Sequence, residues 1–320
     1  MKPIGGFFEL ELTDNGAPYH PDAFFLNTGR ACINLFLKEK RPRKIFVPFY
    51  CCNSLIDPII ENSIPYEYYS LNEKLEIADE IVPEFDELII YINYFGIKSD
   101  YIHELISSYG VNLIIDNTHG FFERDYKLCS SFNSARKYFG VPDGAYLYSN
   151  DSLRAELLPN QSISCSHLVN RFIGNIQKGY DQFLEYENSI TSEIRSGSLL
   201  SKFLLDNINY NDVSKKRTLN FKHYMEGLGE VNTLSFAPSL EDSVPFVYPL
   251  LLDKIIDKQK LFEKKIFVPT YWNDILTRGI KSFEFEKFFS TNLLPLPIDH
   301  RYGEGEIDYV INQILRLYEN

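Results

Sequence analysis

Lys137 lies in a sequence setting suited to amine chemistry. It stands three residues after Ser134, behind a segment at 128–133 that we expect to be a strand. A Gly-Val-Pro-Asp-Gly run at 140–144 predicts a turn that sends the chain into a second strand at 145–149. A lysine held between two strands is aimed in one direction rather than left free in solvent.

Asp116 and His119 follow a run of residues at 111–115 that is rich in β-branched side chains. Such a run predicts a strand. The acid and the imidazole therefore come at the carboxyl end of this strand, which is the edge where open α/β sheets bind ligands.

A lysine and a strand-end carboxylate suit one kind of cofactor chemistry. An amine forms a Schiff base with an aldehyde, and pyridoxal phosphate also needs a carboxylate that keeps its pyridine nitrogen protonated, so that the ring can accept electrons. Asp116 suits that role, and His119 is placed to lie over the ring face. Lysine and aspartate are also common in turns and helix caps, so these residues alone leave a purely structural interpretation open.

A candidate phosphate site lies nearer the start of the chain. Thr28, Gly29 and Arg30 follow a short apolar segment at 24–26, and the apolar residues at 33, 36 and 37 then repeat with helical spacing. The amino end of a helix presents free N–H groups and a partial positive charge, which favours a bound phosphate. An ordinary capped helix start is the alternative interpretation.

A strand expected at 44–48 leads to Tyr50, Cys51 and Cys52 at the start of another helix. Tyr50 is placed to pack on a flat cofactor ring. The two cysteines are interpreted as small buried side chains rather than nucleophiles, because no activating histidine or basic neighbour accompanies them.

Strands and helices alternate through the first half of the chain, with further strands expected at 66–71 and 88–92 and a helix at 100–109. This order predicts the α/β class, with a mostly parallel sheet and helices on both of its faces.

The pattern changes after residue 150. It is helical from 151 to about 224, and it then predicts a strand at 244–251, a helix at 254–264, a strand at 266–268 and a helix at 307–318. We therefore expect three parts: an N-terminal arm at 1–21, a large domain with its linking helices at 22–224, and a small C-terminal α+β domain at 225–320.

Composition excludes several classes of protein. A formal net charge of -12 over 320 residues argues against a nucleic-acid surface. The five cysteines form no CxxC pair and have no histidine at zinc spacing, so no metal site is predicted and reduced thiols are expected. No apolar run approaches the roughly 18 residues of a membrane span, and the amino terminus lacks the apolar core of a signal peptide. These features favour a soluble, cytoplasmic protein that does not contact membranes.

Taken together, the motifs resemble those of the DegT/DnrJ/EryC1/StrS family. The resemblance covers nearly the whole chain from about residue 24, and five motifs occur in the family's order. These are Thr28-Gly29-Arg30 at a helix start, Val47-Pro48 before a second helix, Asp116-Asn117-Thr118-His119, Lys137 before the 140–144 turn, and Tyr248-Pro249 followed by Leu294-Pro295-Leu296-Pro297. Members are pyridoxal-phosphate enzymes of fold type I, most of them aminotransferases that act on nucleotide-linked keto sugars. The resemblance thus implies a large domain with a helix-covered sheet and a small C-terminal domain.

The resemblance also implies roles for individual residues. Lys137 matches the Schiff-base lysine, Asp116 the partner of the pyridinium nitrogen, His119 the residue that stacks on the ring, and Gly29 the phosphate-loop glycine.

Three positions depart from the family pattern. Arg30 and Phe132 stand where hydroxyl residues often bind the phosphate, and Cys52 stands where an aromatic residue is common. Arg30 and Ser134 are therefore expected to bind the phosphate instead. The Gly-Tyr-Asn-Tyr-Arg stretch through which a partner subunit reaches the phosphate is not recognisable in this chain.

The implied activity is transamination by a homodimer. Lys137 would hold the cofactor and then move a proton during transfer of the amino group, with glutamate as the expected donor, pyridoxamine phosphate as the alternate cofactor form and a keto sugar as acceptor. Two alternatives stay open. One is a pyridoxal-phosphate lyase or desulfurase on the same fold, of which a desulfurase would need Cys51 or Cys52, and the other is a catalytically degenerate binding or regulatory protein. Residues 300–302 are interpreted as a turn and Trp272 as a packing residue, rather than as substrate contacts.

Overall fold

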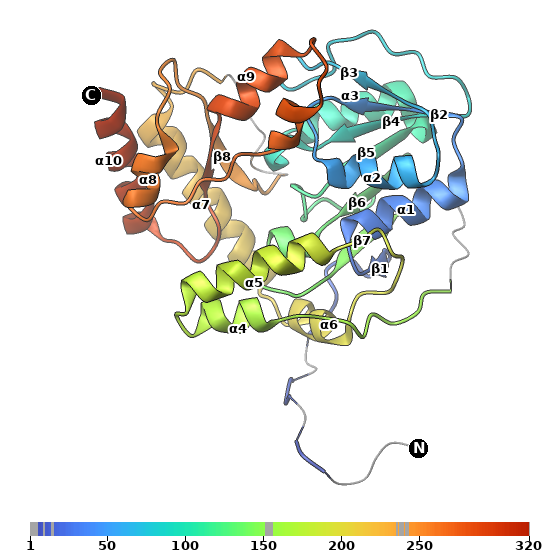
Figure 1. Ribbon diagram of the computed structural model, residues 1–320, viewed down its shortest axis with the longest axis horizontal. Helices are drawn as coiled ribbons and strands as arrows, with labels where there is room; N and C mark the ends of the chain where they lie inside the picture. Colours follow the sequence, from blue (N-terminus) through green and yellow to red (C-terminus); the bar gives the residue numbers. More distant parts are fainter. Residues whose placement is uncertain are drawn as a thin grey trace.

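A seven-stranded sheet forms the larger part of the molecule in the computed structural model, which describes residues 6–8, 10–13, 16–150, 156–234, 236, 240 and 243–319 (Figure 1). Its strands follow the order β1-β7-β6-β5-β4-β2-β3. They are β1 (Phe24–Leu26), β2 (Lys44–Pro48), β3 (Tyr66–Tyr69), β4 (Glu87–Ile92), β5 (Leu113–Asn117), β6 (Ser130–Asn133) and β7 (Ala145–Tyr148).

Most neighbouring strands of this sheet run parallel. The pairs β2–β3, β2–β4, β4–β5 and β5–β6 are parallel, whereas β7 runs antiparallel to both β6 and β1. The carboxyl ends of β2, β4, β5 and β6 consequently meet at one edge, and β1 ends there too because it is also antiparallel to β7. That edge carries the segments in which the sequence predicts the site.

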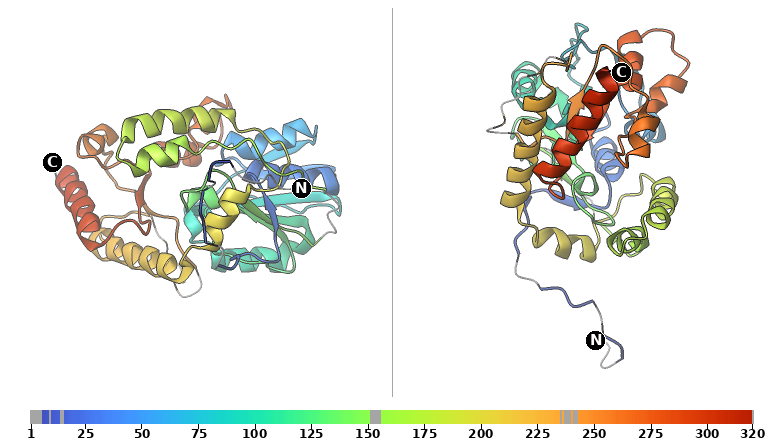
Figure 2. Two further views of the ribbon diagram at one scale, coloured as in Figure 1. Left: turned by 90° about the horizontal axis from the view of Figure 1, so that it is seen from below. Right: turned by 90° about the vertical axis from the view of Figure 1, so that its left-hand side faces the viewer.

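Helices cover both faces of the sheet, with α1 and α2 on one face and α3 on the other (Figure 2). They are α1 (Gly29–Lys40), α2 (Asn53–Glu61) and α3 (Ser99–Tyr109), with short 3-10 turns η1 (Tyr94–Gly96), η2 (Gly110–Asn112) and η3 (Ala135–Lys137) between strands. All six residues of β4 are buried, as expected of a central strand with helices on both sides. The predicted α/β class with a mostly parallel sheet is confirmed.

Four helices follow the sheet: α4 (Ser166–Phe172), α5 (Ile176–Ser189), α6 (Leu199–Asp206) and α7 (Tyr210–Leu228). The first two form an antiparallel hairpin that lies along the lower side of the molecule in Figure 1. The predicted domain boundary at residue 225 falls inside α7, so this helix carries the chain from the large sheet to the C-terminal part. The division into an arm and two domains remains our proposal.

The C-terminal part is built around a two-stranded antiparallel sheet of β8 (Val247–Leu250) and β9 (Leu294–Pro297). Its remaining elements are α8 (Lys258–Glu263), η4 (Asn273–Thr277), α9 (Glu284–Asn292) and α10 (Glu304–Glu319), and α10 packs against α7 (Figure 2).

The strand predicted at 266–268 is wrong. Ile266 and Val268 are buried but pair with no strand, and β9 takes the place beside β8 instead. The sequence did not indicate β9 as a strand, because proline has no N–H to donate to a neighbouring strand and argues against a central strand. Pro295 and Pro297 are nevertheless tolerated here, since each strand of a two-stranded sheet is an edge strand.

Residues 6–8 and 10–12 of the N-terminal arm project from the body of the molecule, with Phe7 and Phe8 almost fully exposed (Figure 1). His20, near the end of the arm, is instead buried and forms a hydrogen bond with the hydroxyl of Tyr148 at 2.8 Å. Among the residues that the structure describes, no helix has the length and apolar character needed to cross a membrane.

Candidate active site

A cavity opens at the carboxyl edge of the large sheet, with an empty volume of about 730 Å³ that includes its part open to solvent. It is lined by Thr28, Gly29, Arg30, Ile33, Cys52, Ser54, Leu55, Ile92, Asp116, Thr118, His119, Phe132, Ser134, Arg136, Lys137, Glu187, Ile190 and Trp272. Every site residue predicted from the sequence lines this cavity except Tyr50. The strand ends bring these residues together from positions more than 100 apart in the chain.

The turn between β6 and β7 sets the direction of Lys137. The N–H of Ala135 donates to the carbonyl of Gly144 at 3.0 Å, which closes the turn, and the N–H of Gly144 donates to the carbonyl of Asn27 at 2.8 Å, which ties it to the loop before α1. Gly144 has a backbone φ of 117°, a value that residues other than glycine rarely adopt. Lys137, at the end of η3, thereby extends into the cavity from a fixed backbone.

Asp116 lies at the end of β5 and is almost fully buried. Its Oδ1 accepts a hydrogen bond from the N–H of Thr118 at 2.8 Å. Burial raises the pKa of the Asp116 carboxyl to about 6, although hydrogen bonds from Thr118 and the charge of Lys137 act in the opposite direction. The carboxylate is therefore short of compensating positive charge, and a cationic ring nitrogen would supply it.

His119 presents a flat, uncharged ring beside Asp116. It is stacked on Phe246 with 4.4 Å between ring centroids, and its Nδ1 finds no hydrogen-bond partner among the described residues although it is buried. Burial lowers the pKa of His119 well below its usual range, and the charge of Lys137 lowers it further. A neutral imidazole at this place suits contact with an aromatic ligand.

Trp272 is an aromatic residue of the cavity that the sequence did not indicate as part of the site. It lines the cavity, and its indole lies within 17° of parallel to the ring of His119. The expected packing role holds as well, because the side chain is 9% exposed. No local sequence signal indicated the cavity, since Trp272 reaches it from the C-terminal part of the chain.

Asp274 and Arg278, which follow Trp272 in the chain, connect its segment to the start of α2. A carboxylate oxygen of Asp274 accepts from the N–H of Asn53 at 2.9 Å. The guanidinium of Arg278 donates to the carbonyls of Phe49 at 2.6 Å and Cys51 at 2.8 Å. The backbone of Trp272 itself has a φ of 54°, so these contacts hold a bulky residue in a conformation that it rarely adopts.

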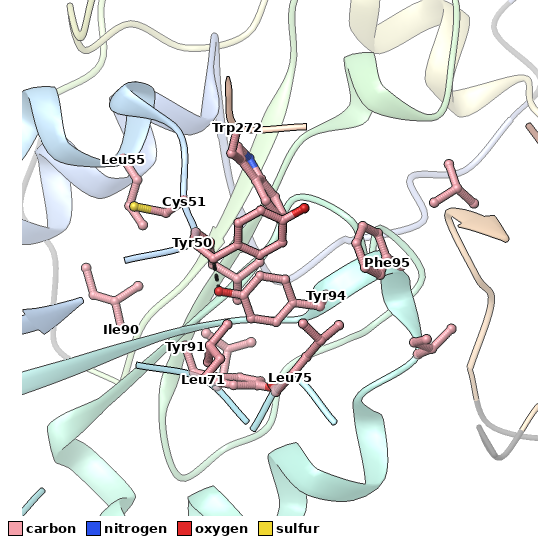
Figure 3. Close-up of a cluster of buried hydrophobic side chains, with 14 of the residues drawn as sticks. Tyr50, Cys51, Leu55, Leu71, Leu75, Ile90, Tyr91, Tyr94, Phe95 and Trp272 are labelled. Carbon is pink, nitrogen blue, oxygen red and sulfur yellow. Dashed lines mark hydrogen bonds between the residues drawn. The ribbon is translucent and has the colours of Figure 1, made fainter. Parts of the chain in front are cut away.

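Tyr50 lies behind Trp272 rather than in the cavity. It is fully buried and meets Trp272 edge to face, with 4.5 Å between ring centroids, in the aromatic cluster of Figure 3. The structure thus does not bring Tyr50 to the predicted site, because its side chain points from the β2–α2 turn into the core.

The neighbouring cysteines are not activated. Burial raises the pKa of the Cys51 thiol to about 12, even though Arg278 is close to it. Burial also raises the pKa of Cys52, which lines the cavity, against the opposite effect of Lys137. Both thiols therefore stay protonated near neutral pH, and neither resembles a nucleophile.

Cations gather at the end of the cavity beside α1. The Oγ1 of Thr28 accepts from the N–H of Ala31 at 3.0 Å and caps the helix. Arg30 donates to the carbonyl of Ile190 at 3.0 Å and to the Oγ of Ser54 at 2.6 Å, while its buried Nε has no partner among the described residues. Arg136, which sequence reasoning did not select, forms an ion pair with Glu187 in the same wall.

Gly29 is not required by packing, since a Cβ atom there would come no closer than 3.6 Å to another group. Residues 299–302 form a turn, in which the N–H of Tyr302 donates to the carbonyl of Asp299 at 3.1 Å, and Arg301 pairs with the Asp299 carboxylate. None of residues 300–302 lines the cavity.

Solved structures of aminotransferases share this fold. NtdA from Bacillus subtilis, with bound cofactor PMP, is 14% identical with a TM-score of 0.64 over 93% of this chain and 73% of that chain. The sugar aminotransferase CalS13 from Micromonospora echinospora is 13% identical, with a TM-score of 0.59 over 92% and 87%. A DegT DnrJ EryC1 StrS aminotransferase from Brucella abortus is 15% identical, with a TM-score of 0.59 over 91% and 84%.

No protein-family model and no curated protein matches the sequence. The structural likeness confirms the expected fold, that of the fold type I aminotransferases, over nearly the whole chain.

The residues of the cavity fit pyridoxal phosphate. A buried carboxylate has a raised pKa, a neutral ring and an indole supply flat surfaces, a lysine lines the same cavity, and two arginines lie at one end. These groups match, in kind, what a pyridinium nitrogen, a flat ring, an aldehyde and a phosphate require.

Proposed function

We propose that this chain is a pyridoxal-phosphate-dependent aminotransferase that transfers an amino group to a keto sugar. One observation carries the proposal: the Lys137 amine and the buried Asp116 carboxylate line the same cavity and interact electrostatically in an aminotransferase fold. A turn lysine and a helix-capping aspartate would have no reason to meet in this way.

The chain offers a holder for each part of the cofactor. When bound, pyridoxal phosphate supplies an aldehyde that takes up amino groups and a ring that accepts electrons. Lys137 would hold it covalently, Asp116 would bind the ring nitrogen, the stacked His119 and Trp272 would supply aromatic surface beside the ring, and Thr28, Gly29, Arg30 and Ser134 would bind the phosphate.

Two side chains would move or hold protons. Lys137 lines the cavity, and its Nζ would carry a proton from one carbon of the substrate–cofactor pair to another. The Asp116 carboxylate would keep a proton on the ring nitrogen throughout, because burial in the protein strengthens the attraction between the two charges. Burial of Asp116 and His119 keeps water away from that side of the site.

A keto sugar is proposed as acceptor because the structural neighbours include the sugar aminotransferase CalS13. Glutamate is proposed as donor, and a homodimer as the working form, on the resemblance of the sequence motifs. The desulfurase alternative is not favoured, since Cys51 is buried and the pKa values of both the Cys51 and Cys52 thiols are raised.

Incubation of the purified protein with pyridoxal phosphate and glutamate tests the proposal. Denaturation followed by chromatography should recover pyridoxamine phosphate and 2-oxoglutarate in equal amounts, and Lys137→Ala should yield neither. Borohydride reduction before digestion should place the cofactor on the peptide that contains Lys137. Label on another lysine would contradict the assignment, and binding at Lys137 without amino transfer from any amino acid would favour the degenerate alternative.

A further inference from the structure

The carboxyl end of α5 covers the cationic end of the cavity. Glu187 and Ile190, from this end of the helix, line the cavity together with Arg30 and Arg136. In Figure 1 the α4–α5 hairpin lies at the lower left, with α5 pointing toward β7 and α1. The cover is thus supplied by the same chain.

Both arginines are engaged by this helix end. Arg136 pairs with the carboxylate of Glu187, and its guanidinium also lies over the ring of Tyr186 at 5.0 Å. Arg30 donates to the carbonyl of Ile190, the residue that ends α5. These contacts are favourable in themselves, because cations stabilise the negative end of a helix.

Glu187 places a negative charge at this end of the cavity. The Glu187 side chain is 39% exposed, whereas that of Arg136 is 14% exposed. Water can therefore receive the carboxylate if it leaves, but the guanidinium stays in the wall and needs an anion. The backbone of Arg136 is held in place as well, because Arg136 lies in η3 directly before Lys137.

We propose that Glu187 is a built-in competitor for the anion site of the cavity, and that a phosphate group displaces its carboxylate from Arg136. A phosphate dianion and Glu187 cannot both remain at Arg136 without strong repulsion between like charges. The exchange removes the ion pair that fastens the end of α5, so anion binding loosens the α4–α5 hairpin. The identity of the anion as the phosphate of a cofactor rests on the proposed function.

Phosphate binding to the full-length, cofactor-free protein tests this exchange. Inorganic phosphate and, separately, pyridoxal phosphate are titrated into wild type and Glu187→Gln, and dissociation constants are measured by calorimetry. Glu187→Gln should bind both about three- to tenfold more tightly, the range expected for loss of a partly exposed ion pair. The matched control is Glu185→Gln, which removes the same charge from an exposed position on the same helix and should bind like wild type.

A second background shows whether Glu187 acts through Arg136. In Arg136→Met, the further change Glu187→Gln should no longer increase phosphate affinity, because the guanidinium with which Glu187 competes is absent. The effects of the two substitutions should therefore not be additive. Hydrogen exchange provides a readout independent of affinity: phosphate should speed amide exchange in α5 of wild type and leave Glu187→Gln unchanged.

Equal phosphate affinities of Glu187→Gln and Glu185→Gln would overturn the competitor role, as would the absence of phosphate binding in every variant. Either result together with covalent uptake of pyridoxal phosphate on Lys137 would leave the proposed function intact. Tighter phosphate binding by Glu187→Gln without uptake of pyridoxal phosphate on Lys137 would support the competitor role and contradict the proposed function.

Discussion

The indole of Trp272 and the imidazole of His119 lie almost parallel, with 17° between their planes and 5.3 Å between their centroids. His119 follows a strand of the large sheet, and Trp272 belongs to the C-terminal part of the chain. This aromatic surface of the cavity is therefore assembled from two distant segments of the chain.

Trp272 is the only tryptophan, so its emission reports directly on the cavity. Pyridoxal phosphate should quench this emission in a saturable titration. Trp272→Ala should weaken cofactor binding by about two- to tenfold, which corresponds to one aromatic contact, and Trp272→Phe should weaken it less. Equilibrium dialysis measures the variants, which have no tryptophan emission. Unchanged emission in protein that carries cofactor on Lys137 would contradict contact with Trp272.

Asp116→Ala should preserve the fold and covalent binding of the cofactor but reduce turnover by several orders of magnitude. The reason is that the ring nitrogen would lose the carboxylate that keeps it protonated. Steady-state assays with glutamate and a keto sugar, alongside circular dichroism, measure both effects. Near-normal turnover would show that another acid fills the role.

The contribution of Asp116 to the stability of the cofactor-free protein should fall as the pH rises from about 4 to about 6, because the pKa of this carboxyl is raised from 3.8 to about 6 in the folded state. In this window Asp116 is protonated to a greater extent in the folded protein than in the unfolded chain. Asp116→Asn lacks this titration and should be more stable than wild type by roughly 3 kcal/mol above pH 6. Denaturant unfolding across the pH range measures the gap, which should close below pH 4. A gap independent of pH would refute the assignment.

Gly144→Ala should destabilise the protein by about 1 to 3 kcal/mol, because alanine rarely adopts a φ of 117° and its Cβ would meet the Phe25 ring at 3.2 Å. Gly29→Ala is the matched control, since its Cβ meets nothing closer than 3.6 Å. Thermal unfolding of both variants should separate them. Similar losses in both would mean that the 140–144 turn tolerates a side chain.

Arg217 is a buried cation that supports the residue beside Lys137. It is 1% exposed, its guanidinium lies over the ring of Tyr138 at 4.4 Å, and it donates to the carbonyl of Phe246 at 3.1 Å. Arg217→Met should lower the free energy of unfolding by about 1 to 3 kcal/mol, because that carbonyl loses its donor. The exposed Lys215→Met, on the same helix, should have little effect in urea unfolding. An unfolding free energy of Arg217→Met equal to that of Lys215→Met would show that the buried charge is dispensable.

Local sequence was sufficient for most of the large sheet and for selecting the residues at the centre of the proposed site. Apolar runs bounded by turn residues predicted β2, β4 and β5, and strand-end residues predicted Asp116, His119 and Lys137 as neighbours of a ligand. These features are readable because periodicity and turn chemistry act over a few residues.

Tertiary structure alone decided the rest of the cavity. Trp272 and Glu187 enter through contacts with segments more than 50 residues away, such as Asp274 with Asn53 and Glu187 with Arg136. Tyr50 leaves the site because its ring packs into the aromatic core. Such outcomes depend on which surfaces meet after the sheet has formed, and packing between distant segments leaves no periodic trace in a single sequence.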